Sequence, residues 1–352
     1  AFYVSPEGSD DNPGTREAPF KTIQKARDVL RDQKEDCAAD ITVLLRGGVY
    51  RLDAPLTFGP PDSGKNGGRV IYAAAPGETP VISGGVPVAG WEQDSGGRWK
   101  AQVALKGFRQ LYVNGKRAQR ARGTCPENVE RYGDQKSMDA DAGFIFPDGA
   151  MAEWEHPWAM EFGFYNSWGH MICRAERITR NLEGRAVVKM LQPWFMLASN
   201  KEGVQAKLPA YMENALELLD EPGEWYYGPV NDTLYYWPRE GEDMASAEVV
   251  APQLETLVCL EGRAGRPVRN LVFQGITFAD ATWVKPDRIG HPDVQANFCF
   301  HDTNIFTRDG SLVNVHNEYV KSPANVVARG AEGCRFEGCT FTRLGGAGLD
   351  IE

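Results

Sequence analysis

The sequence lacks the features that define nucleic-acid-binding or membrane proteins. Its 352 residues carry a formal net charge of −10, and the 38 Lys and Arg residues are scattered along the chain. Phosphate binding needs a concentrated positive surface, so no nucleic-acid partner is expected. No apolar run approaches the ~20 residues of a membrane-spanning helix, and no charged-then-apolar leader is present. We therefore expect no membrane partner.

Residues that build cofactor sites are also too scattered to define one. The seven cysteines show neither metal-ligand spacing nor a disulfide framework, and we interpret them as small core residues. The five histidines show no two-His spacing with a nearby acid, so no metal and no other cofactor is expected. G-x-S-x-G, P-loop and dinucleotide-binding motifs do not occur in the sequence.

The first thirty residues predict a short strand, a polar loop and an amphipathic helix. Apolar residues recur at helical spacing over Phe20–Leu30, and Thr22 or Thr15 suits the helix N-cap. The loop "SDDN" at 9–12 is acidic, but its residues lack the regular spacing of a calcium loop. We interpret them as turn residues.

Most of the remaining chain reads as short apolar strands separated by turns, in keeping with 38 Gly and 22 Pro. Residues 270–281 and 333–344 form a weak repeat, in which Gly275 aligns with Gly338 and each other equivalent pair is also 63 residues apart. Repeated short strands with Gly at the corners are typical of a β-solenoid. An open solenoid end exposes core and unpaired strand edges, so the N-terminal helix is expected to cap the first coil.

Three regions of the chain differ in character. Residues 1–107 contain the cap helix and the first coils. Residues 108–250 are polar and aromatic-rich, begin with a hairpin at Asn114–Gly115 and lack the repeat, which predicts an inserted antiparallel β domain. Residues 251–352 return to solenoid coils. The sequence stops within a predicted strand, so we expect remaining C-terminal coils, from the same or another chain, to cover the second end.

Several segments resemble a known family. They are "FYVSPEGSDDNPGTREAPFKTIQKA", "LYVNGKRAQRAR", "YMENALELLDEPGEWYYG", "TLYYWPREGEDM" and "GCRFEGCTFTRLGGAGLDI". These resemble secreted bacterial right-handed parallel β-helix proteins that act on plant polysaccharides, and most closely glycoside hydrolase family 141, which includes α-L-fucosidases and xylanases. The resemblance covers nearly the whole chain. It implies a right-handed parallel β-helix, a secreted or periplasmic location and a carbohydrate substrate bound on the flank of the helix.

Glycoside hydrolysis requires two carboxyl groups that flank the scissile bond, and the sequence offers three candidates. In "GAGLDIE" the apolar residues should face the core, which leaves Asp350 and Glu352 on the outer face ~6.6 Å apart. Gly residues before them leave room for a substrate. Asp302, in the long insertion between the two repeat copies, is the other candidate acid. The alternative for each is a solvated strand face or a loop turn.

Aromatic and polar residues provide candidates for substrate binding. Trp168 and His170 in "NSWGH" and Trp225 in "EWYYG" suit stacking on a sugar, because aromatic rings offer flat apolar surface; the alternative is a role in the β-domain core. Glu213 is placed to bind a hydroxyl group or simply to end a strand. The remaining candidates lie after the first repeat copy and in the insertion: Asp280, Trp283, Gln295, Asn297 and His301.

The sequence therefore predicts a glycoside hydrolase acting on plant cell-wall polysaccharide or oligosaccharide, of the pectin side-chain, fucoside or xylan type. One alternative is a polysaccharide lyase on a uronate polymer, which needs a Lys or Arg base, usually beside Ca²⁺. Lys285, Lys321 and Arg343 are its plausible bases, and no acidic calcium nest accompanies them. A second alternative is a non-catalytic β-helical module for glycan binding or adhesion.

Overall fold

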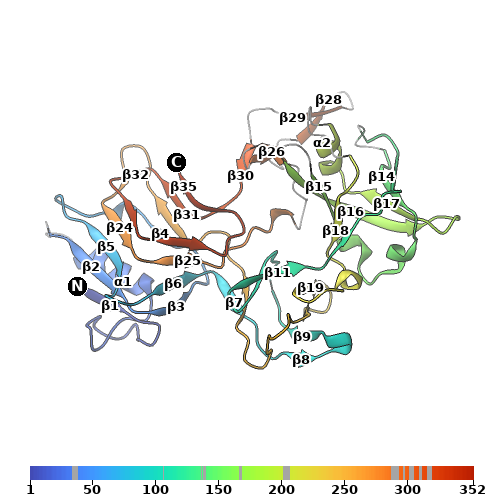
Figure 1. Ribbon diagram of the computed structural model, residues 1–352. Helices are drawn as coiled ribbons and strands as arrows, with labels where there is room; N and C mark the ends of the chain where they lie inside the picture. The colour runs from blue at the N-terminus through green and yellow to red at the C-terminus, as the bar shows by residue number, and fades with distance from the viewer. Residues whose placement is uncertain are drawn as a thin grey trace. The chain divides into compact units, whose positions relative to one another are not determined.

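The computed structural model describes most of the chain, and the described part is mostly β with few helices, which confirms the all-β prediction. The described residues are 1–33, 39–105, 107–135, 137, 140–165, 169–200, 207–286, 293–295, 298–300, 305–308, 311–314 and 319–352. They form two compact units (Figure 1). Unit 1 comprises residues 1–87, 250–283 and 323–352, and unit 2 comprises 88–249 and 284–322. None of the helices in the described ranges is long and apolar enough to cross a membrane.

Unit 1 contains three sheets whose strands pair in parallel. The first has the order β1 (Phe2–Val4), β2 (Ile41–Leu45), β5 (Val70–Ala74), β24 (Leu271–Gln274) and β33 (Arg335–Glu337). The second has the order β3 (Gly48–Arg51), β6 (Pro80–Ser83), β25 (Thr277–Ala279) and β34 (Thr340–Thr342). The third has the order β4 (Leu56–Phe58), β22 (Val258–Glu261), β31 (Ala324–Arg329) and β35 (Ala347–Ile351). In addition, β23 (Val268–Arg269) pairs in parallel with β32 (Ala331–Glu332), and β7 (Gly85–Pro87) pairs antiparallel with β21 (Val249–Pro252).

The register of these sheets confirms the sequence repeat. Phe273 on β24 lies opposite Phe336 on β33, and Phe278 on β25 lies opposite Phe341 on β34. The ring of Phe273 stacks between Tyr72 and Phe336, with centroid distances of 5.6 and 5.1 Å. The corner glycines of the two copies take positive φ values of 68° and 59°, which glycine adopts without a steric penalty. The rings of Phe273 and Phe278 are thus buried by the strands on both sides.

The N-terminal helix α1 (Ile23–Gln33) packs its apolar face on the core of unit 1 through Ile23, Ala26 and Leu30. The hydroxyl group of Thr22 accepts the N–H of Lys25 at 3.1 Å, which confirms Thr22 as the cap and explains why the helix begins later than Phe20. The carboxylate of Asp10 accepts the backbone N–H groups that precede the helix, so this acid acts in the turn as predicted.

Unit 2 is built mainly from antiparallel strands. One run has the order β10 (Leu111–Val113), β11 (Lys116–Arg120), β19 (Glu224–Gly228), β20 (Thr233–Tyr236), β9 (Trp99–Gln102) and β8 (Glu92–Gln93), with only β11 and β19 parallel among the described pairs. The other has the order β12 (Arg122–Thr124), β18 (Tyr211–Glu213), β15 (Glu161–Tyr165), β16 (His170–Arg180), β17 (Ala186–Met190), β14 (Gly143–Phe146) and β13 (Glu130–Tyr132). The hairpin of β10 and β11 turns at Asn114–Gly115 with positive φ at both residues, as predicted.

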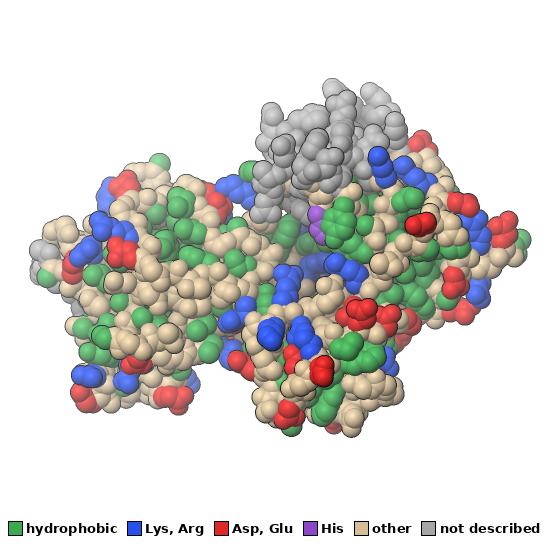
Figure 2. Space-filling view, viewed as in Figure 1, with side chains coloured by type: hydrophobic (Ala, Val, Ile, Leu, Met, Phe, Trp, Pro, Cys, Tyr) green, Lys and Arg blue, Asp and Glu red, His purple; other side chains and the backbone are tan. Residues whose placement is uncertain are grey.

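Shorter elements complete unit 2. They are α2 (Trp194–Asn200), η2 (Ser95–Gly97), η3 (Ala150–Glu153), η4 (Pro157–Ala159), η5 (Leu216–Leu218), β26 (Asp293–Gln295), β27 (Phe298–Phe300), β28 (Ile305–Arg308), β29 (Ser311–Asn314) and β30 (Tyr319–Lys321). Buried Phe144, Phe162, Phe164 and Phe195 form the centre of its core. Charged side chains of both signs reach the surface of each unit (Figure 2). Each unit therefore has an apolar core of its own beneath a charged surface.

The ladder of stacked rings in unit 1 gives a test of the fold. We expect Phe273→Ala to lower the free energy of unfolding by about 3–5 kcal/mol, because the ring is 1% exposed and its loss leaves a cavity between Tyr72 and Phe336. Gln274→Ala, at the exposed neighbouring position of β24, should change it by less than about 0.5 kcal/mol. Urea unfolding followed by circular dichroism measures both. Equal effects of the two variants would contradict the packing described here.

Candidate functional site

Asp350 lies on β35, on the face of the sheet that points away from the core. In the pairing of β31 with β35, Leu349 lies opposite Val326 and Asp350 lies opposite Val327. Leu349 packs against the core of unit 1, and successive residues of a strand point to opposite faces. The carboxylate of Asp350 therefore belongs to the outer face of the third parallel sheet.

Glu352, two residues further on, forms an ion pair. The Nε atom of Arg329 donates to the carboxylate of Glu352 at 2.8 Å, and this hydrogen bond raises the pKa of Arg329. Arg329 also interacts electrostatically with Asp350. The guanidinium group thus lies within the field of both acids, and it holds Glu352 in a partly exposed surface pair.

Asp280 occupies a buried corner of unit 1. It is 2% exposed, and its carboxylate accepts hydrogen bonds from the Ser83 hydroxyl group at 2.6 Å and from the Nε atom of Arg343. Its φ of 60° places it in the left-handed region that Asp tolerates better than most residues. These contacts give Asp280 a structural role, and they engage Arg343, one of the plausible lyase bases.

The glycines before Asp350 have a packing role that the sequence did not reveal. A Cβ atom on Gly345 would lie 2.4 Å from the carbonyl carbon of Thr282 and 2.5 Å from the backbone nitrogen of the half-buried Trp283. Glycine is therefore required at Gly345 because two backbone segments approach closely there.

Some predicted site residues lie outside the described part of the chain. They are Trp168, Asn297, His301 and Asp302. Gln295 lies in β26, and only its backbone is described. The roles assigned to these residues stay predictions.

Two predicted site residues of unit 2, Glu213 and His170, lie near Tyr211. Glu213 is on the same strand as Tyr211, and His170 contacts the Tyr211 hydroxyl group. His170 is half-buried on β16, and its Nε2 atom lies 2.7 Å from the hydroxyl oxygen of Tyr211. Burial lowers the pKa of His170. Glu213 ends β18 and is 3% exposed.

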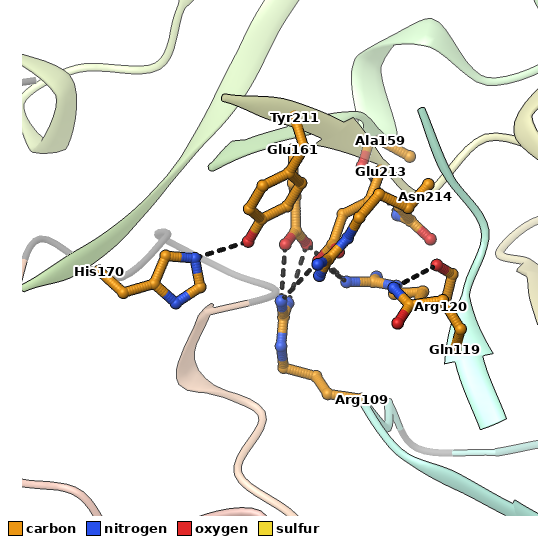
Figure 3. Close-up of polar contacts among 10 residues, drawn as sticks. Arg109, Gln119, Arg120, Ala159, Glu161, His170, Tyr211, Glu213 and Asn214 are labelled. Carbon is orange, nitrogen blue, oxygen red and sulfur yellow. Dashed lines mark hydrogen bonds and ion pairs between the residues drawn. The ribbon is translucent and has the colours of Figure 1, made fainter. Parts of the chain in front are cut away.

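The buried carboxylate of Glu213 belongs to a larger group of charges, which we call the Arg–Glu network: Arg109, Arg120, Arg122, Glu161 and Glu213. Figure 3 labels Arg109, Arg120, Glu161 and Glu213 of this network. Glu161 and Glu213 lie directly opposite each other on β15 and β18. Arg109 donates to Glu161 at 2.7 and 2.9 Å, and Arg122 donates to Glu213 at 2.6 Å. Arg120 lies 3.2 Å from the Glu161 carboxylate. The two acids are thus bridged by shared guanidinium groups.

The network fixes the ionisation of Glu161. Burial alone would raise the pKa of this carboxyl group, but the charges of Arg109 and Arg120 and the hydrogen bond from Arg109 outweigh that effect and lower the pKa to about 2. Glu161 and Glu213 lie at directly opposed strand positions, where Cβ atoms stand about 5 Å apart. The lowered pKa does not suit Glu161 to the role of a general acid, which must carry a proton near neutral pH. Its carboxylate oxygens already accept hydrogen bonds from Arg109 and Arg120, so the network is suited to holding structure and to accepting hydrogen bonds.

A pocket of about 270 Å³ lies beside this network. Glu161 and Arg120 form part of its polar wall. Trp225, which is 1% exposed and stacks on Phe108 at a centroid distance of 4.7 Å, forms part of its aromatic wall. Trp158, which is 46% exposed, lines it as well. The pocket combines ionised groups with aromatic surface.

Glu161, Arg109, Arg120 and Trp158 were not among the site residues predicted from the sequence. One available signal was the acid at the start of the otherwise apolar strand "EFGFY", because a charge next to a buried strand needs a partner. The arginines of "NGKRAQRAR" were the other signal. Their pairing depends on strand register, which the sequence pattern does not give.

Known proteins resemble this chain in sequence and in fold. A family model described as the GH141 insertion domain matches residues 98–239, a range that includes the Arg–Glu network and all residues lining the pocket. A solved structure titled "Glycoside hydrolase" superposes on this chain with a TM-score of 0.82 and 30% identity, covering 99% of this chain and 63% of that one. The predicted resemblance is confirmed: the chain is GH141-like, and its residues 98–239 match the GH141 insertion-domain model.

Two curated proteins share a shorter stretch. "Uncharacterized protein YwoF" of Bacillus subtilis (strain 168) is 39% identical over 83 residues, which is 24% of this chain and 15% of that protein. "Pectate lyase PEL9" of Emericella nidulans (strain FGSC A4) is 37% identical over 83 residues, which is 24% of this chain and 18% of that protein. The chain thus spans less than a fifth of these curated relatives.

The Arg–Glu network predicts an asymmetric response to charge removal. We expect Glu161→Gln to lower the free energy of unfolding by about 3–5 kcal/mol, because it leaves three clustered guanidinium groups with only the Glu213 carboxylate to balance them. Glu153→Gln, which breaks an exposed pair with Arg180, should change it by at most about 1 kcal/mol. Chemical denaturation at neutral pH compares the two. A Glu161→Gln protein as stable as Glu153→Gln would show that the network does not hold unit 2 together.

The lowered pKa of Glu161 also predicts how stability depends on pH. A carboxyl group with a folded-state pKa of about 2 stabilises the folded state fully above its unfolded pKa of about 4.3, and that contribution is lost as the pH falls toward 2. The stability difference between the wild type and Glu161→Gln should therefore shrink between about pH 5 and pH 2. Thermal unfolding across this range tests the point, and a constant difference would argue against an ionised Glu161.

Proposed function

We propose that the protein is a glycoside hydrolase that acts on plant cell-wall polysaccharide or oligosaccharide of the pectin side-chain, fucoside or xylan type. The observation that carries this proposal is the similarity of 99% of the chain to a solved glycoside hydrolase. The GH141 insertion domain supports the same activity. A secreted or periplasmic location belongs to the proposal, since polymeric plant glycans are met outside the cytoplasm.

The proposed scaffold is a right-handed parallel β-helix in unit 1 with an inserted β domain. Residues 1–107 form the cap helix and first coils, residues 108–250 the inserted domain, and residues 251–352 the later coils. The three parallel sheets support this scaffold, because each adds its strands in the same order along the chain. Outward side chains of neighbouring strands in such a sheet stand ~4.8 Å apart. A regular outer face of this kind suits an extended glycan.

Asp350 is the proposed catalytic carboxylate. Its place on the outer face of β35 leaves it off the core, and Arg329 interacts with it electrostatically. A neighbouring guanidinium group favours the charged form of a carboxylate, which is the form that a base or nucleophile needs. We therefore assign Asp350 to that role. Glu352, which pairs with Arg329, and Asp302 stay the candidates for the opposing acid.

A polysaccharide lyase is the second candidate function. It is favoured by the identity of 37% to pectate lyase PEL9 over 83 residues. The contact of Arg343 with buried Asp280 weighs against it, because a base must be accessible and able to lose its proton. A lyase produces an unsaturated sugar, whereas a hydrolase produces a reducing end without one, so the two products separate the candidates.

Replacement of Asp350 tests the proposed role. We expect Asp350→Asn to lower kcat on a plant oligosaccharide by about 10²–10⁴-fold, because an amide has no charge to act as base or nucleophile. Glu337→Gln, which removes an exposed carboxylate from β33, should retain wild-type kcat. Release of reducing ends and ultraviolet absorbance of unsaturated product are followed in parallel. Wild-type turnover by Asp350→Asn, or unsaturated product from the wild type, would contradict the proposal.

A further inference from the structure

The pocket in unit 2 presents an aromatic platform whose position is fixed by the protein itself. Trp158 lies in the short turn η4, where the N–H of Ala159 donates to the carbonyl oxygen of His156 at 2.9 Å. The side chain of Asn214 donates to the carbonyl oxygen of Ala159 at 2.8 Å. The turn is therefore tied on both sides of Trp158.

The ring of Trp158 has a neighbour that orients it. The imidazole ring of His156 meets it edge-on, with centroids 5.9 Å apart and an interplanar angle of 86°. His156 is itself buried, and its Nδ1 atom lies 3.0 Å from the hydroxyl oxygen of Tyr226. A large ring that remains 46% exposed is held in place in a pocket wall, which is the arrangement that stacking on a flat ligand requires.

The polar wall presents donor and acceptor groups next to each other. Glu161 is an acceptor held ionised, and Arg120, 3.2 Å away, is a donor; both line the pocket. Adjacent hydroxyl groups of a sugar each donate and accept, so they match such a pair. The network already holds these two side chains in place, so ligand binding costs less side-chain entropy.

The charges of the pocket wall indicate the kind of sugar. Two acids, Glu161 and Asp232, and two arginines, Arg120 and Arg174, line it among the described residues. These charges balance, so the wall offers no excess of positive charge for the carboxylate of a uronic acid. The wall therefore favours an uncharged ring.

We propose that this pocket is a carbohydrate-binding subsite for a neutral glycosyl unit, which stacks on Trp158 and hydrogen-bonds to Glu161 and Arg120. The choice of a plant glycan as the source of this unit rests on the proposed function. The subsite gives the insertion domain a binding role, and binding does not depend on turnover.

Calorimetric titration of the whole protein in an Asp350→Asn background tests the subsite without turnover. The probes are a neutral xylo-oligosaccharide, a fucosylated oligosaccharide and an oligogalacturonate as the acidic control. We expect a neutral probe to bind, and Trp158→Ala to weaken its binding about tenfold, the scale of one lost aromatic stack. Trp158→Phe should keep most of the affinity. Trp91→Ala, a Trp of unit 2 that is not among the residues lining the pocket, should leave it unchanged.

The outcomes of this titration separate the subsite from the hydrolase proposal. Unchanged affinity in Trp158→Ala, binding of oligogalacturonate alone, or no binding of either neutral probe would overturn the subsite. Binding that depends on Trp158 supports it even where the enzyme assay detects no hydrolysis. If the parent protein hydrolyses glycan but binding does not depend on Trp158, the hydrolase proposal stands and the subsite proposal is wrong. Thermal unfolding of each variant verifies that the exposed substitution preserves the fold.

Discussion

The in-register parallel pairing of unit 1 is the constraint on which its other features depend. A strand of three or four residues cannot bury its inward ring alone, so Phe273 needs Tyr72 on one side and Phe336 on the other. The same register determines which residues face outward. Asp350 is on the outer face because Leu349 opposite Val326 is on the inner one. Packing and the candidate catalytic position are therefore set together.

Unit 2 meets a different physical requirement. Its two facing acids, Glu161 and Glu213, are buried, and burial of charge is tolerated only with partners that offset the lost hydration. Arg109, Arg120 and Arg122 supply these partners from strands and loops distant in sequence. The consequence for function is a rigid polar wall, in which one carboxylate stays ionised and lines a pocket.

The sequence predicted the features that depend on local spacing. The helix was predicted from apolar periodicity and the Thr22 cap. The pairing of β25 with β34 was predicted from the sequence repeat, in which Phe278 aligns with Phe341. The sequence did not reveal Glu161 and Arg109 because these residues are 52 positions apart and meet only through the register of unit 2. Trp158 was missed because its exposure is set by a turn held by His156 and Asn214. The reason for Gly345 was misjudged, since it depends on a backbone approach across the fold.

We propose that this GH141-like chain cleaves glycosidic bonds in plant glycans by hydrolysis. Proton magnetic resonance of the reaction with a defined xylo-oligosaccharide and a defined fucosylated oligosaccharide tests it most directly, because anomeric and olefinic signals report the chemistry of each new end. We expect new anomeric signals of a free reducing sugar, with no olefinic signal, from at least one of the two. An olefinic signal, or unchanged spectra for both oligosaccharides, would contradict it.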